Sequence, residues 1–147
     1  MQMQTDSSFD LDNFLPYQLA VVAGRASKAF SEIYSAEAGL TVPEWRIMAH
    51  LLKAEAVSVR EIHLRTDLDK PKVSRASDRL EAEGLLVKKV NPRDRRLVEL
   101  SLTPAGRALM MKLIPLANQF QQKLLEQLGG DAATFSAALS RMMDDSK

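Results

Sequence analysis

The spacing of apolar side chains predicts a mainly helical chain that is interrupted once by two short strands. Helical periodicity runs from Leu11 to about Glu37, and a second helix begins at "TVPEWRIMAHLLK". Two shorter helical segments follow, "SVREIHLRT" and "LDKPKVSRASDRLEAEG". Only about four residues separate them, and two helices joined by such a turn are typical of a helix-turn-helix.

The ends of these paired helices carry recognisable signals. Ser58 and Glu61 have the three-residue spacing of a capping box at the start of the first helix. Asp69 is the expected N-cap of the second helix, and Gly84 marks its end. The second helix is therefore expected at about residues 70–83.

The apolar period changes from helical to two after Gly84. "LLVKKV" and "RLVELSL" are both typical of strands, and "NPRDR" between them is typical of a hairpin turn. At "TPAGR" the helical period returns and continues to about Leu128, with a bend expected at Pro115. A last short helix is expected from Asp131 through Met143. This order predicts a mainly α fold with a small β-hairpin (α+β), a winged helix-turn-helix flanked by N- and C-terminal helices.

Composition mainly excludes functions. The chain has no cysteine, which excludes disulfides and thiol chemistry, and its histidines, His50 and His63, have no acidic cluster of ligand spacing nearby. We therefore expect no metal site. There is no nucleophile with a matched base and no glycine-rich phosphate loop, so we predict a protein that is not an enzyme and needs no cofactor. Without an apolar run of about 20 residues or a signal-peptide pattern, we expect a cytoplasmic protein with no membrane contact.

Charge is concentrated in one block of the chain. The formal net charge is only +1. Residues 60–107, however, hold twelve Lys and Arg against eight Asp and Glu, whereas the remaining residues are net acidic. A polyanion would therefore be attracted to one patch of the surface rather than to the whole protein.

The second helix of the pair has one face suited to a DNA groove. At about 100° per residue, small and apolar side chains lie on one side and polar side chains on the other. The outward polar set is Lys70, Lys72, Ser74, Arg75 and Arg79. Arginine can contact guanine with two hydrogen bonds, while lysine and serine hold phosphate. The alternative is a solvated face on which the two arginines pair with Asp78 or Glu83.

The turn "NPRDR" and the residue after it place three guanidinium groups close together, those of Arg93, Arg95 and Arg96. Such a cluster repels itself unless an anion is near, and a narrow minor groove concentrates negative potential. Asp94 is better suited to orient a neighbouring guanidinium group, and Arg96 is its expected partner. A merely solvated turn is the alternative, but the preceding basic helix favours joint contact with one duplex.

"LDKPKVSRASDRLEAEGLL" followed by "NPRDRRLVELSLTPAGR" resembles the MarR family of bacterial transcriptional regulators. The wing motif of that family usually begins with aspartate, where this chain has Asn91, which can still hydrogen-bond locally. The resemblance implies a homodimer that binds a pseudo-palindromic operator in double-stranded DNA, most often as a repressor. It places the helix at 70–83 in the major groove and the wing arginines in the flanking minor groove. The competing hypothesis is a winged-helix module for protein–protein interaction.

The same resemblance divides the chain by role. The implied parts are a flexible N-terminus (1–10), a dimerising helix (11–40), a winged helix-turn-helix region (41–102, with the wing at about 85–102) and C-terminal dimerising helices (103–147).

A ligand site is implied by the resemblance as well. "LTVPEWRIMAHL" is similar to a branch of regulators linked to aromatic-compound catabolism, and many relatives bind a small aromatic acid beside the DNA-binding lobe. On that basis Trp45 would stack on a ring, and Arg25, Arg46 or His50 would receive a carboxylate. The structural alternatives are a core position for Trp45, a salt bridge for Arg46 and an ordinary helix position for His50.

Overall fold

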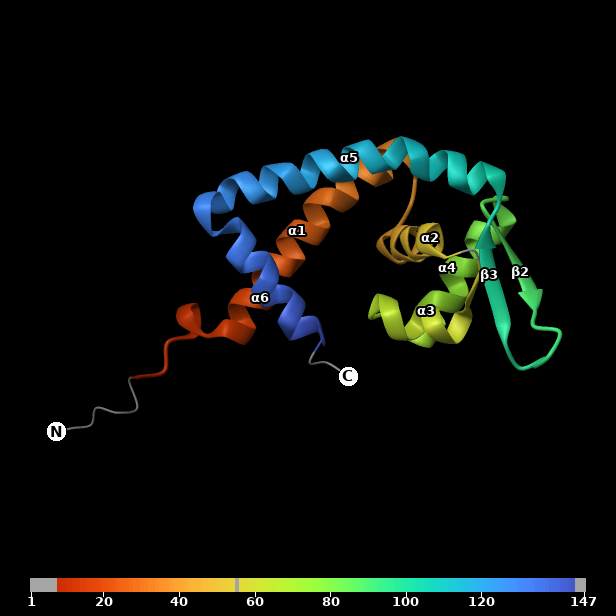
Figure 1. The fold of residues 1–147 in the computed structure, drawn as a ribbon, viewed down its shortest axis with the longest axis horizontal. Helices are drawn as coiled ribbons and strands as arrows, with labels where there is room; N and C mark the ends of the chain where they lie inside the picture. Colours follow the sequence, from red (N-terminus) through yellow and green to blue (C-terminus); the bar gives the residue numbers. More distant parts are fainter. Residues whose placement is uncertain (1–7, 55, 145–147) are drawn as a thin grey trace. The chain divides into compact units, whose positions relative to one another are not determined.

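A computed structural model describes residues 8–54 and 56–144. The predicted flexible terminus at 1–10 therefore lies, except for residues 8–10, outside the described part. The chain forms two compact units, Met1–Met110 and Met111–Lys147. The elements in chain order (Figure 1) are η2 (Leu11–Asn13), α1 (Leu15–Ala38), α2 (Val42–Lys53), β1 (Val57–Ser58), α3 (Val59–Thr66), α4 (Lys70–Ala82), β2 (Leu86–Val90), β3 (Val98–Leu102), α5 (Pro104–Leu128), η3 (Gly129–Asp131) and α6 (Ala132–Asp144).

The mainly α fold with a small sheet is confirmed, but the sheet has one strand more than the predicted hairpin. Its order is β1-β3-β2, and both pairings are antiparallel. In the added pair, Val57 lies opposite Leu100 and Ser58 lies opposite Glu99. A two-residue strand has no period for a sequence pattern to reveal. Consequently, the prediction of a two-stranded hairpin was incomplete.

The first long helix begins later than its apolar period indicates. Leu11–Asn13 form a separate turn of 3₁₀ helix, and Phe14 is extended before α1 begins at Leu15. Pro16 accounts for this position, because proline lacks an N–H group and is tolerated in the first helical turn but not further inside.

Side-chain caps fix the starts of the helices around the turn. The side chain of Ser58 accepts a hydrogen bond from the Glu61 N–H group (3.0 Å) at the start of α3. The side chain of Asp69 accepts a hydrogen bond from the Lys72 N–H group (2.8 Å) at the start of α4, so both predicted N-caps are confirmed. A complete capping box occurs at α2 instead, where Thr41 and Glu44 bond reciprocally at 3.0 and 3.3 Å. These caps set where each helix starts.

Within the first unit, α2, α3 and α4 pack against one another and beside the sheet (Figure 1). Apolar side chains from every one of these elements are almost fully buried. They include Ile47, Met48, Leu51, Val57, Ile62, Val73, Leu80, Leu86 and Leu100. This core holds one face of α4 inward and leaves the opposite face for solvent or a partner.

The wing joins α5 through a tight contact at Gly106. The N–H group of Thr103 donates to the carbonyl oxygen of Leu85 (3.1 Å), and the Thr103 hydroxyl donates to the carbonyl oxygen of Gly84 (2.6 Å). The same hydroxyl accepts from the N–H group of Gly106 (3.0 Å) and caps α5. A β-carbon at Gly106 would overlap the Leu85 carbonyl oxygen, so this position requires glycine.

The second unit contains most of α5, with η3 and α6. Pro115 lies inside α5 without ending it. α6 has no buried residue. Across residues 8–54 and 56–144, no helix is both long and apolar enough to cross a membrane.

Candidate nucleic-acid interface

The packing of α4 divides its side chains into two sets, as the periodicity predicted. Val73, Ala76, Ser77 and Leu80 are buried, and the Ser77 hydroxyl donates to the carbonyl oxygen of Val73 (2.7 Å). This local bond satisfies the one polar group on the inward face. The charged side chains of α4 are all exposed.

All five outward residues predicted for DNA contact are exposed, and four of them form no ion pair within the described residues, namely Lys70, Lys72, Ser74 and Arg75. Arg75 lies nearly opposite the buried face, since a turn of about 100° per residue places it about 160° from Val73. No hydrogen bond or ion pair within residues 8–54 and 56–144 engages its guanidinium group. A solvated ion pair, the alternative for this residue, is therefore not formed, and its donors remain available to an acceptor outside the chain.

Arg79 has a different environment from the other four. Its guanidinium lies 3.4 Å from the carboxylate of Glu44 and 3.7 Å from that of Glu83, and it donates to the carbonyl oxygen of Gly39 (3.4 Å). For Arg79, the predicted alternative of an ion pair with Glu83 is therefore confirmed. Sequence reasoning missed the pair with Glu44, because that residue is 35 positions away and was not recognised as a helix cap.

A second set of ion pairs attaches α4 to the wing. Lys88 of β2 pairs with Asp78 and lies 3.8 Å from Glu81, both of which are on α4. The backbone N–H group of Lys88 also donates to Glu81 (3.3 Å). Asp78, the alternative partner for Arg75 or Arg79, therefore holds the helix against β2 instead.

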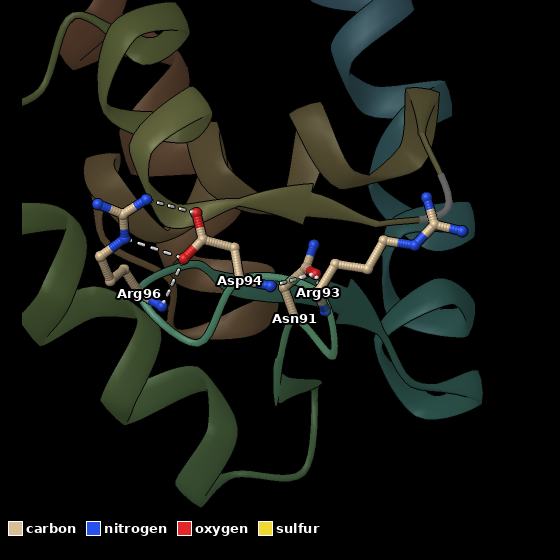
Figure 2. Close-up of polar contacts among 4 residues, drawn as sticks. All are labelled: Asn91, Arg93, Asp94 and Arg96. Carbon is tan, nitrogen blue, oxygen red and sulfur yellow. Dashed lines mark hydrogen bonds and ion pairs between the residues drawn. The ribbon is translucent and has the colours of Figure 1, made fainter.

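Asn91 organises the turn of the wing (Figure 2). Its side-chain oxygen accepts hydrogen bonds from the N–H groups of Arg93 (2.8 Å) and Asp94 (3.2 Å). Its amide donates to the carboxylate of Glu99 on β3 (3.2 Å). The local hydrogen bonding expected of Asn91 is therefore confirmed, and the amide performs two tasks that an aspartate could not both perform, since a carboxylate has no donor.

Asp94 and Arg96 form the pair that the sequence predicted. Nε and Nη2 of Arg96 donate to the two carboxylate oxygens of Asp94 (3.0 and 3.1 Å), and the Arg96 backbone N–H group adds a third bond (3.1 Å). These bonds hold the pKa of Asp94 below the usual aspartate range and raise the pKa of Arg96. Figure 2 shows Arg93 extending away from this pair. Within the described residues, no bond engages the guanidinium groups of Arg93 and Arg95, and both residues are exposed.

A groove of about 630 Å³ lies between the start of α3, one flank of α4 and the wing. Its lining is Val59, Arg60, Lys70, Ser74, Ser77, Lys88, Asp94, Arg96, Leu97 and Val98. Four of these side chains are cationic and one is anionic. Arg60 was not among the predicted contacts, because its place beside the wing depends on the β1–β3 pairing, which the sequence did not reveal.

The residues expected to bind an effector are only partly brought together. The ring of Trp45 stacks on Tyr34 (centroids 5.3 Å apart, 16° between planes) and meets Phe30 edge-on (5.1 Å). Trp45 is thus part of an aromatic cluster between α1 and α2, where it is half-buried rather than in the core. Arg25 is exposed on α1, and no contact in the described structure joins it to the others.

Arg46 and His50 both interact with the C-terminal turn of α3. Arg46 donates to the carbonyl oxygen of Thr66 (3.3 Å), and His50 hydrogen-bonds the backbone of Arg65. The guanidinium of Arg46 is favourable there, because the last carbonyl groups of a helix are unsatisfied and carry partial negative charge. Burial, and then the charges of Arg65 and Lys53, lower the pKa of His50 below its usual value. The residues that the structure describes include no group of three or more His, Cys, Asp or Glu suited to a metal ion.

The fold and this surface define the class of protein. A helix-turn-helix (α3 and α4) is followed by a β-hairpin whose arginine-rich turn lies beside the second helix, and a third strand ties the two together. This is a winged helix-turn-helix.

Comparison with known proteins narrows the class to a family. The MarR family model matches residues 38–97. The HTH-type transcriptional repressor MdtR of Bacillus subtilis (strain 168) is 35% identical over 68 residues, which are 46% of this chain and 44% of that protein. The chain spans only about half the length of the curated relatives it matches.

Solved structures match over nearly the whole chain. A MarR family transcriptional regulator from Silicibacter pomeroyi DSS-3 has a TM-score of 0.83 at 28% identity, covering 95% of this chain and 100% of that one. Bordetella bronchiseptica BpsR, whose DNA binding is regulated by 6-hydroxynicotinic acid, has a TM-score of 0.80 at 27% identity, with 93% and 97% covered. The chain belongs to the MarR family, which confirms the resemblance carried by its helix-turn-helix and wing.

Proposed function

We propose that this protein is a homodimeric transcriptional regulator that binds a pseudo-palindromic operator in double-stranded DNA. α4 would enter the major groove through Arg75, with Lys70, Lys72 and Ser74 beside it. The wing would bring Arg93 and Arg95 to the flanking minor groove. One observation carries the proposal: a single lobe presents unpaired guanidinium groups on both α4 and the wing, where they have no acceptor within the described chain.

The test is a DNA-binding titration at several salt concentrations. Binding should weaken steeply as salt rises, because each neutralised phosphate releases counterions. Arg95→Ala should weaken binding and reduce the slope of log K against log salt by about one. Lys28→Ala, which removes one exposed positive charge from α1, is the control and should leave the slope unchanged.

Arg75→Ala separates base reading from phosphate contact. If Arg75 contacts a base edge, its loss should cost about 1–3 kcal/mol on the operator and much less on random DNA. The operator itself is obtained by sequencing the fragments that the protein selects from a genomic pool. A wild-type protein that ignores duplex DNA, or binds it independently of salt, would refute the proposal and favour a protein–protein interaction module.

Exposed apolar side chains support the dimer. α1 buries only Tyr34 out of 24 residues and exposes Val22 at 59%. α6 buries none of its residues. Helices with apolar faces of this kind normally bury them against another element. Val22→Asp should therefore lower the mass found by light scattering from dimer to monomer, whereas Ala20→Asp, on the other side of α1, should not. A monomeric wild type at micromolar concentration would refute the dimer.

We further propose that a small aromatic carboxylate releases the protein from DNA, so that it acts as a repressor. BpsR supports this choice of ligand class. A carboxylate could replace the α3 carbonyl groups as the partner of Arg46 and His50 and so disturb the end of that helix. The experiment adds 6-hydroxynicotinic acid or benzoate to the protein–DNA complex, with uncharged nicotinamide as the control. Release by the acids, and its loss in Arg46→Gln, is the expected result; equal release by nicotinamide would contradict it.

A further inference from the structure

Arg79 connects the helix proposed to enter DNA with the junction between α1 and α2. α1 ends at Ala38, and the left-handed backbone of its C-cap, Gly39 (φ 68°), turns the chain toward the cap of α2. The carbonyl oxygen of Gly39 accepts a hydrogen bond from Nη2 of Arg79, while Nη1 lies 3.4 Å from Glu44 in the first turn of α2. One side chain of α4 thus contacts the C-cap of one helix and the first turn of the next.

The partner at this junction is a carboxylate with little access to water. The side chain of Glu44 is only 4% exposed. Its Oε1 accepts the N–H group of Thr41 in the capping box, which leaves Oε2 facing Arg79. A buried carboxylate is costly unless it is paired and hydrogen-bonded, and Arg79 is the one cation that pairs with it among the described residues.

Arg79 lies on the flank of α4 that faces the α1–α2 junction, and its contacts there distinguish it from the other outward residues. On a helix of about 100° per residue, it lies on the flank next to buried Ala76, whereas Arg75 lies nearer the outward centre. The opposite flank of α4 carries Asp78, which pairs with Lys88 of the wing. α4 is therefore fastened on both flanks, to the wing on one side and to the α1–α2 junction on the other.

We infer that Arg79 is a positioning residue, which sets the orientation of α4 against the α1–α2 junction through Glu44 and does not itself contact DNA. This revises the sequence prediction that grouped Arg79 with Arg75. The DNA-binding part of the inference rests on the proposed function. The ion pair with Glu44 can be tested without DNA.

The experiment is a double-mutant cycle with Arg79→Gln, Glu44→Gln and the double variant, followed by urea unfolding at fixed protein concentration. Arg79→Gln should destabilise most, because it leaves the Glu44 carboxylate buried without a cation. Adding Glu44→Gln should recover part of the loss, so that the effects on the unfolding constant are non-additive by a factor of roughly five or more. Additive effects would overturn the inference. Arg79→Lys, which keeps the charge, supplies the measurement if Arg79→Gln does not fold.

DNA binding gives the second measurement. Arg79→Gln should weaken operator binding without changing the slope of log K against log salt, whereas Arg75→Gln or Arg95→Gln should lower that slope by about one if it touches phosphate. The double variant should regain affinity relative to Arg79→Gln. A reduced slope for Arg79→Gln with no recovery would show direct DNA contact. If wild type shows no salt-dependent binding, the proposed function fails, while the unfolding cycle still decides the role of the ion pair.

Discussion

Replacing Gly106 with alanine tests the contact between the wing and α5. The added methyl group would overlap the carbonyl oxygen of Leu85 and lie 3.0 Å from its carbonyl carbon and 3.3 Å from Cδ2 of Leu102. Both obstructions belong to the strand ends, and the first is backbone, which cannot move aside by changing a rotamer. Either α5 or the strand end must shift, and the hydrogen bond from Thr103 to Leu85 would lengthen or break.

The expected loss of stability follows from these contacts. Overpacking a tight site costs about 1–3 kcal/mol. Losing one backbone hydrogen bond adds about 0.5–1.5 kcal/mol. A total of about 2–4 kcal/mol should lower Tm by roughly 5–15 °C, since each kcal/mol is worth about 2–4 °C in a domain of this size.

Urea and thermal unfolding of Gly106→Ala at fixed protein concentration measure the effect. Gly24→Ala is the matched control, because a β-carbon at Gly24 in α1 meets no atom within 4 Å. Alanine in a helix interior should stabilise by about 0.5–1 kcal/mol relative to glycine. Opposite signs for the two variants are therefore expected. A Gly106→Ala protein within about 0.5 kcal/mol of wild type, which is the usual range of neutral surface changes, would refute the tight contact.

Three further predictions concern titratable and polar groups. Arg96→Gln should raise the pKa of Asp94 toward the usual range, and NMR titration measures this pKa. In wild type the pair stabilises the wing above the unfolded-state pKa of Asp94. This stabilisation is lost as pH falls through the lower folded-state pKa, below about pH 4. Because the pKa of His50 is lowered in the folded state, wild type should lose stability as pH falls from about 7 toward 5, and His50→Gln should lose less; equal losses would contradict this. Asn91→Asp should destabilise the wing at neutral pH, because it replaces the donor to Glu99 with a second carboxylate. Hydrogen exchange of the wing amides should then be faster than in wild type, and this difference should become smaller in acid.

Much of the DNA-binding lobe could be predicted from the sequence because its signals are local. Asp69 lies at the N-cap of α4, and the buried and exposed sides of that helix follow from residues within four positions of each other. The pair between Asp94 and Arg96 spans two residues of one turn. In such cases geometry within the element decides the contact.

The remainder depends on contacts distant in sequence. Val57 pairs with Leu100 across 43 positions, and Arg79 reaches Glu44 across 35. The local alternatives, Asp78 and Glu83, apply to both Arg75 and Arg79, so no local pattern points to Glu44. Only the packing of α2 against α4 shows that Arg79 reaches this buried carboxylate.

The strand order β1-β3-β2 has a consequence for folding during synthesis on the ribosome. β3 is the central strand, yet it is the last of the three to be synthesised. Until Leu102 has emerged, β1 and β2 have no strand to pair with, and their unpaired edges are open to other chains. Because the loop between Val57 and Leu100 must close before the sheet forms, its closure should be a late and slow step of folding. Premature termination within residues 91–98 would therefore leave a fragment with the complete sequence of the helix-turn-helix but without the strand that joins it to the wing.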